Sequence, residues 1–80
     1  MTYPQTVDLE RELAPVVIRE ILAVYAEQRI SLSYATRTVG TQWFYRALNE
    51  GFSFEVAQNA RRYVHRVGEE LKASYYHRRA

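Results

Sequence analysis

The chain has 80 residues, of which 48% are hydrophobic, 14% aromatic and 25% charged, with a net charge of +2 and no cysteine. A chain of this length indicates a single domain over residues 1–80, and its hydrophobic content excludes a disordered chain. The lack of cysteine excludes disulfides and thiolate metal sites, so helix packing or self-association has to stabilise the fold.

Charge is unevenly distributed along the chain. Residues 1–30 carry three arginines against five acidic residues, a net −2, and residues 58–80 carry six basic residues against two acidic ones, a net +4. A basic end of this kind suits a phosphate backbone or an acidic protein. The first twelve residues lack the pattern of a secretory signal, and no apolar stretch is long enough to span a membrane. We therefore expect a cytoplasmic protein with no membrane partner.

The first expected helix covers residues 7–28, where apolar residues recur at helical spacing. Pro15 interrupts the pattern, and a proline inside a helix removes a hydrogen bond, so the helix either kinks or splits there. Ile18 and Leu22 widen the apolar stripe beyond half of the circumference. If neighbouring helices leave these two residues uncovered, they form an exposed apolar patch, and such patches usually mark interfaces.

The second expected helix covers residues 33–50, with Ser31 or Ser33 as its N-cap. On a helical wheel, about half of its circumference forms an apolar core face: Leu32, Val39, Trp43, Phe44, Ala47 and Leu48. On the opposite side, spacings of four, three and four align a second, uncharged stripe, the tyrosine strip: Tyr34, Thr38, Thr41 and Tyr45. Tyrosine is favoured at protein interfaces, although it also lies half exposed to water on many surfaces.

The segment Gly51-Phe52-Ser53 predicts a tight corner between the second and third helices. Gly51 suits the left-handed residue that follows a helix, and Ser53 suits the N-cap of the next helix. We expect the rings of Phe52 and Phe54 to pack around this corner.

The third expected helix covers residues 54–75, followed by a frayed tail at residues 76–80. Its apolar stripe consists of Val56, Ala60, Tyr63, Val64, Val67, Leu71 and Tyr75. Its other face is basic, and cations on one helix face are the usual footprint of phosphate binding. The candidates for nucleic-acid contact are Arg61, Arg62, His65, Lys72 and Tyr76. An ordinary solvated helix surface has the same composition.

No motif indicates catalysis, a cofactor, a metal or a small-molecule ligand. His65 and His77 are the two available imidazole bases, and without a cysteine or a glycine-rich loop no catalytic triad or phosphate site can be drawn. His65 and Glu69 lie one turn apart, but two ligands do not make a metal site. A helix-turn-helix with its turn at Gly40 fails, because Arg46 would then take a buried position.

We therefore expect an all-α, compact three-helix bundle that binds another protein through the tyrosine strip, Ile18 and Leu22, as a regulator, adaptor or inhibitor. Two alternatives remain: a nucleic-acid-binding regulator that uses the third helix, and a self-associating structural bundle. A homodimer fits each of these, because so short a chain buries little core alone. Short helical chains of this kind are common among viral and mobile-element accessory proteins.

Overall fold

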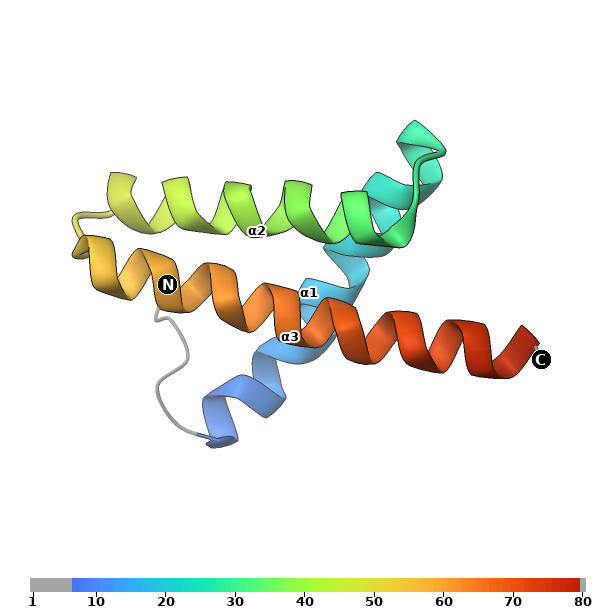
Figure 1. Ribbon diagram of the computed structural model, residues 1–80. Helices are drawn as coiled ribbons and strands as arrows, with labels where there is room; N and C mark the ends of the chain where they lie inside the picture. The colour runs from blue at the N-terminus through green and yellow to red at the C-terminus, as the bar shows by residue number, and fades with distance from the viewer. Residues whose placement is uncertain (1–6, 80) are drawn as a thin grey trace.

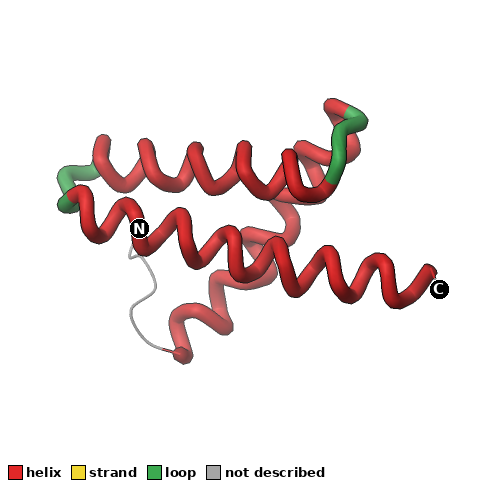
Figure 2. Tube along the Cα trace, viewed as in Figure 1, coloured by secondary structure: helices red, strands yellow, loops and turns green. Residues whose placement is uncertain are grey.

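The computed structural model describes the backbone from residue 7 to residue 79 and the side chains from residue 12 to residue 75. Three helices fill this range: α1 (Val7–Gln28), α2 (Leu32–Asn49) and α3 (Phe54–Arg79), joined by two short loops (Figure 1 and Figure 2). The all-α three-helix fold is thereby confirmed, and the described backbone contains no strand. None of the described helices has the length and hydropathy that a membrane span needs.

α1 and α2 begin and end close to their expected positions. α1 has the expected bounds and continues through Pro15 as one helix, so the split at that residue does not occur. α2 begins one residue earlier than expected, because Ser31 rather than Ser33 is the N-cap. The Ser31 hydroxyl accepts a hydrogen bond from the backbone N–H of Tyr34 at 3.1 Å.

The corner between α2 and α3 forms as the sequence predicts. Gly51 has φ of 92°, a left-handed conformation that glycine adopts without strain. The backbone N–H of Phe52 donates to the carbonyl of Ala47 at 3.0 Å, as in the Schellman arrangement, and the Phe52 ring packs against the core. Ser53 then caps α3 by accepting a hydrogen bond from the N–H of Val56 at 3.2 Å.

α1 ends at the expected residue, whereas α3 ends later than expected. α1 is followed by Arg29, which takes φ of 53° without being a glycine and donates its N–H to the carbonyl of Tyr25 at 3.0 Å. α3 continues to Arg79, four residues beyond the predicted end at Tyr75. Its last turns contain neither proline nor glycine, so no residue interrupts the helical hydrogen bonds.

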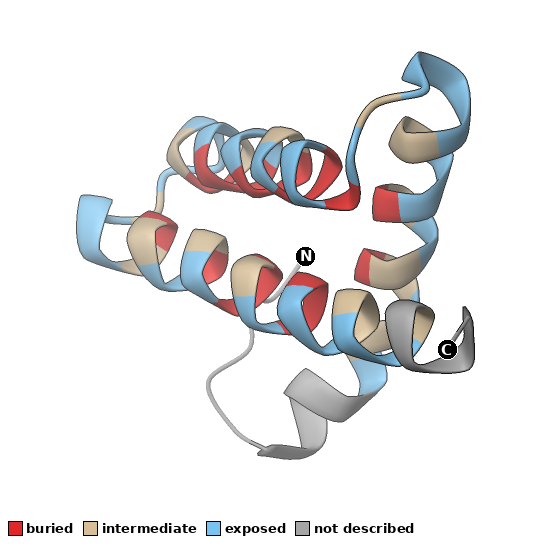
Figure 3. Ribbon diagram, turned by 45° about the vertical axis from the view of Figure 1, so that its right-hand side comes forward, coloured by how far each residue is buried: buried red, intermediate tan, exposed pale blue. Residues whose placement is uncertain are grey.

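α2 and α3 lie side by side as an antiparallel hairpin, and α1 crosses the hairpin on one face (Figure 1). The shortest dimension of the molecule is 16 Å, which fits two layers of helices whose axes lie about 8–10 Å apart. The buried residues of the three helices face one another between these layers (Figure 3). The largest fully buried side chains are those of Trp43, Ile21, Leu32, Val17, Val39 and Val64.

Trp43 joins α2 to α1. Its side chain is fully buried, and its Nε1 donates a hydrogen bond to the Glu20 carboxylate of α1 at 2.8 Å. The Arg46 guanidinium lies 5.7 Å from the centroid of the Trp43 ring and 4.0 Å from the same carboxylate. The bond to Glu20 satisfies the single polar atom of an otherwise apolar side chain, which lets the whole ring enter the core.

α2 and α3 come into close contact at two glycines. A Cβ atom on Gly68 would overlap the Thr36 side chain, 2.9 Å from its Cβ and closer still to its two branches. A Cβ atom on Gly40 would lie 3.2 Å from the His65 ring and 3.3 Å from Cγ of Arg61. The hairpin therefore requires glycine at position 68, where a larger residue would push the two helices apart.

We expect Gly68→Ala to lower the free energy of unfolding by about 1–3 kcal/mol, the usual cost of overpacking a core. A loss of stability would be informative, because alanine normally stabilises a helix interior by about 1 kcal/mol relative to glycine. Urea denaturation followed by circular dichroism measures the change. Adding Thr36→Ala removes the two atoms nearest to the new methyl group and should recover part of the loss. A Gly68→Ala variant as stable as the parent would contradict the close approach.

We expect Trp43→Ala to lower the free energy of unfolding by about 3–5 kcal/mol, because it leaves a cavity in the core and removes the hydrogen bond to Glu20. Trp43→Phe keeps most of the ring and should lose clearly less. The same denaturation experiment compares the two variants. A Trp43→Ala loss below about 1 kcal/mol, within the range of ordinary surface substitutions, would be inconsistent with a buried ring.

Candidate protein-binding surface

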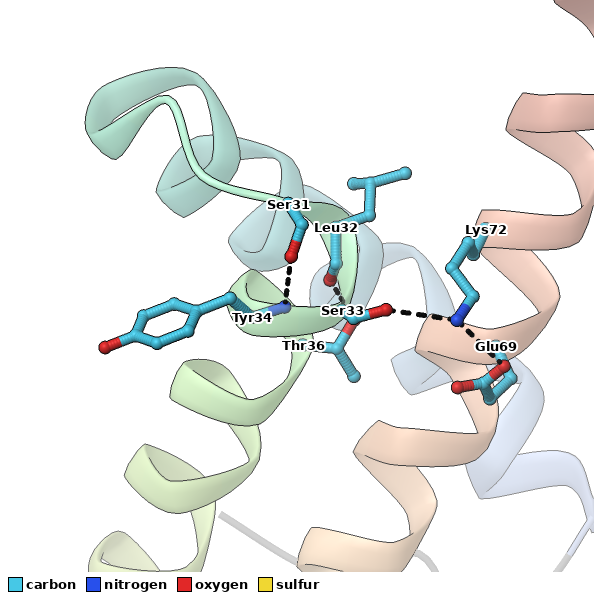
Figure 4. A network of polar contacts seen from close by, with 7 residues as sticks. All are labelled: Ser31, Leu32, Ser33, Tyr34, Thr36, Glu69 and Lys72. Atoms are coloured by element: carbon cyan, nitrogen blue, oxygen red, sulfur yellow. Dashed lines mark hydrogen bonds and ion pairs between the residues drawn. The ribbon is translucent and has the colours of Figure 1, made fainter.

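The tyrosine strip lies on the outside of α2. Tyr34 and Tyr45 are 52% and 57% exposed, Thr41 is exposed and Thr38 is half-buried. The Thr38 hydroxyl donates to the carbonyl of Tyr34 at 3.0 Å. The Tyr34 ring points away from α3 (Figure 4). A partner can therefore reach the strip along about 17 Å, the length of eleven helical residues.

The two α1 residues that would form an exposed apolar patch if left uncovered, Ile18 and Leu22, behave differently from each other. Ile18 is half-buried and packs against the core, whereas Leu22 is 39% exposed. The expected patch is therefore reduced to the single side chain of Leu22. The physical reason is that α1 crosses two helices, so the core covers a wider arc of its circumference than one neighbour would.

Three aromatic rings meet beside the corner, at one end of the hairpin; we call Phe44, Tyr45 and Phe54 the aromatic cluster. Phe44 is only 8% exposed, and the other two rings meet it edge to face, with centroid distances of 5.2 Å to Tyr45 and 5.4 Å to Phe54. The Phe54 ring packs beside the corner against Phe44, but it is 62% exposed and does not enter the core. It is the first residue of α3, and its ring leans on Phe44 from outside the core.

The middle of the predicted basic face lies against α2. The guanidinium of Arg61 lies 5.1 Å from the centroid of the Phe44 ring and donates a hydrogen bond to the Gln58 side chain. The His65 ring is half-buried, and glycine at position 40 leaves room for it against α2. The expectation that this face points into solvent away from the core is therefore wrong at Arg61 and His65.

The end of the basic face is also tied to α2. Lys72 donates to the Ser33 hydroxyl at 3.0 Å and lies 3.5 Å from the Glu69 carboxylate, and Figure 4 shows the Lys72 side chain reaching from α3 to Ser33 on α2. Arg62 is exposed. The side chain of Tyr76, the fifth candidate for nucleic-acid contact, lies outside the described residues.

The described part of the chain offers little support for a helix-turn-helix or a metal site. α2 continues without a break through Gly40, so a helix-turn-helix with its turn there is excluded. Side chains that the structure describes include no group of three or more histidine, aspartate or glutamate residues that could hold a metal ion. The cluster of exposed aromatic rings is the feature that needs an explanation.

Sequence reasoning missed two residues that shape this surface. Gly68 lies eight residues, about two turns, after Ala60, and small residues at this spacing are a readable signal of close helix packing. Phe54 directly follows the N-cap Ser53 and precedes the apolar stripe of α3, which is a weaker signal that its ring lies outside the core.

Comparisons with protein-family models, with curated proteins and with solved structures found no match for this chain. Function therefore has to be inferred from the surface itself.

We expect Phe44→Ala to lower the free energy of unfolding by about 3–5 kcal/mol, since it removes a core ring and the support of two others. Tyr45→Ala and Phe54→Ala should each change it by about 1 kcal/mol or less, because they lose an edge-to-face contact and little burial. Urea denaturation of the three variants measures the contrast. If Phe54→Ala cost as much as Phe44→Ala, Phe54 would belong to the core and not to an accessible surface.

Proposed function

We propose that this chain is a small protein-binding module that acts as a regulator, adaptor or inhibitor and has no catalysis of its own. The observation that supports this most is the aromatic cluster, in which Tyr45 and Phe54 are more than half exposed while a buried ring holds both. Aromatic residues are enriched in protein interfaces. Rings that are already ordered lose little conformational entropy when a partner binds, which favours affinity.

The rest of the tyrosine strip extends this surface along α2. Tyr34 lies about 17 Å from Tyr45 on the same side of the helix. The strip itself carries no charge, so burying it against a partner would leave no unpaired ion. Leu22 lies on α1, and the partner affinity of a Leu22→Ala variant measures whether it contributes to the same surface.

The two alternatives differ in how far the geometry supports them. A second copy of this chain could cover the same rings, so self-association draws on the same surface as partner binding. Nucleic-acid binding through α3 has less support, because Arg61, His65 and Lys72 each contact another part of the hairpin. Arg62 is the described candidate whose exposure suits a phosphate contact.

We expect Tyr45→Ala to leave the fold intact and to weaken partner binding about tenfold or more, because truncating a central interface aromatic costs about 2 kcal/mol or more. Phe54→Ala should act in the same direction. The measurement is affinity capture from the host lysate with the parent chain as bait, with and without nuclease, followed by titration of the captured protein against each variant.

Arg19→Ala is the matched control, since Arg19 is exposed and lies two residues from each of the buried Val17 and Ile21, on the side of α1 that faces away from the hairpin. Folded Tyr45→Ala and Phe54→Ala variants that bind the partner as tightly as the parent would refute the proposal. Capture that disappears after nuclease treatment would support the nucleic-acid alternative. Size-exclusion chromatography with light scattering identifies a second copy as the partner if the parent is an oligomer and Tyr45→Ala is not.

A further inference from the structure

The contacts between α2 and α3 on the side away from α1 indicate what kind of partner fits this surface. Successive residues of a helix are rotated by about 100°, so the contacts given for α2 set its faces. Trp43 faces α1, and Thr36 and Gly40 face α3. Ser33 and Phe44 lie further around α2, beyond Thr36 and Gly40 and still further from the side that faces α1. Their contacts with α3 form what we call the outer seam.

Cations lie at both ends of the outer seam and between them. Arg61 lies beside the aromatic cluster, and Lys72, eleven residues later on α3, bonds to Ser33 at the other end. These positions are about 17 Å apart along the helix. Arg37 on α2 is exposed and lies four residues after Ser33 and seven before Phe44, so helical spacing places it on the same side.

Acidic residues are fewer along this line. Glu69 lies 3.5 Å from Lys72, so it neutralises part of one end of the seam. Arg37 and Arg61 remain as cations nearer the aromatic cluster. The Arg61 guanidinium has five N–H donors, and its hydrogen bond to Gln58 and its position over Phe44 orient it while leaving most of the donors for another acceptor.

We propose that the outer seam and the aromatic cluster together bind an acidic amphipathic helix of a partner protein. Apolar side chains of this helix contact Tyr45 and Phe54, which Phe44 supports from the core, and its carboxylates contact Arg61, Arg37 and Lys72. The seam is straight because two helices form it, and its length equals about three turns of a bound helix. This inference rests on the protein-binding function proposed above and adds the chemistry of the partner.

The charge pattern favours an acidic protein over a nucleic acid. A nucleic-acid strand presents a phosphate about every 3.4 Å along a duplex axis, so it needs a dense row of cations. On the outer seam the cations are widely spaced, and Glu69 would face the phosphates at one end. Carboxylates on one face of a helix recur about every 5–6 Å and can be placed to match single arginines.

The test is selection of binders for the full-length chain from a displayed library of amphipathic helical peptides about three to five turns long. We expect the selected peptides to carry an excess of glutamate and aspartate beside an apolar face. Arg37→Glu and Arg61→Glu should each weaken a selected peptide about fivefold or more, since losing one exposed ion pair costs up to about 1 kcal/mol and reversal adds repulsion. Arg19→Glu, with the same change in net charge, should not.

Three results would overturn the proposal: no peptide is selected, the selected peptides have no acidic excess, or Arg19→Glu weakens binding as much as Arg37→Glu. A single-stranded DNA of about twenty nucleotides that displaces the peptides and binds more tightly would overturn it in favour of nucleic acid. Arg37 is exposed, so Arg37→Glu decides the matter if Arg61→Glu fails to fold by circular dichroism. Binding that is lost in Tyr45→Ala but unaffected by Arg37→Glu and Arg61→Glu would leave the protein-binding function standing without the acidic partner.

Discussion

The geometry of this molecule depends on the close approach of α2 and α3 at Gly68. Because Gly68 has no side chain, Thr36 lies directly against the α3 backbone, and its buried hydroxyl is satisfied by a carbonyl of its own helix at 2.8 Å. Helices this close leave no room between them for long side chains. Arg61 and Lys72 therefore lie along the outer seam, while Trp43 occupies the other side of α2 and binds α1.

The two-layer arrangement explains why so small a domain carries exposed aromatic rings. α1 covers one face of the hairpin, and the shortest dimension of 16 Å leaves no third layer for the other face. Phe44 lies at the boundary, buried enough to belong to the core and close enough to the surface to hold Tyr45 and Phe54. A chain of this length has little apolar surface to spare, so a ring that is 62% exposed at Phe54 favours a role outside folding.

Most of the fold could be predicted from the sequence, because its strongest signals are local. The spacing of apolar residues predicted most helix ends to within a residue or two. Gly51 and Ser53 determine the corner through hydrogen bonds that span only a few residues. The exposed positions of Tyr34 and Tyr45 were equally predictable, since a stripe opposite the core face of one helix needs no knowledge of its neighbours.

Features that depend on how the helices are placed against one another could not be read in the same way. A helical wheel gives the angle of each side chain around its own axis but does not say which neighbour lies at that angle. The contact between Thr36 and Gly68, 32 residues apart, sets how α2 and α3 face each other. The placement of all three helices decides that Ile18 is half-buried, that Arg61 lies over Phe44 instead of in solvent, and that Phe54 joins Phe44 and Tyr45, ten and nine residues earlier in the chain, in one surface.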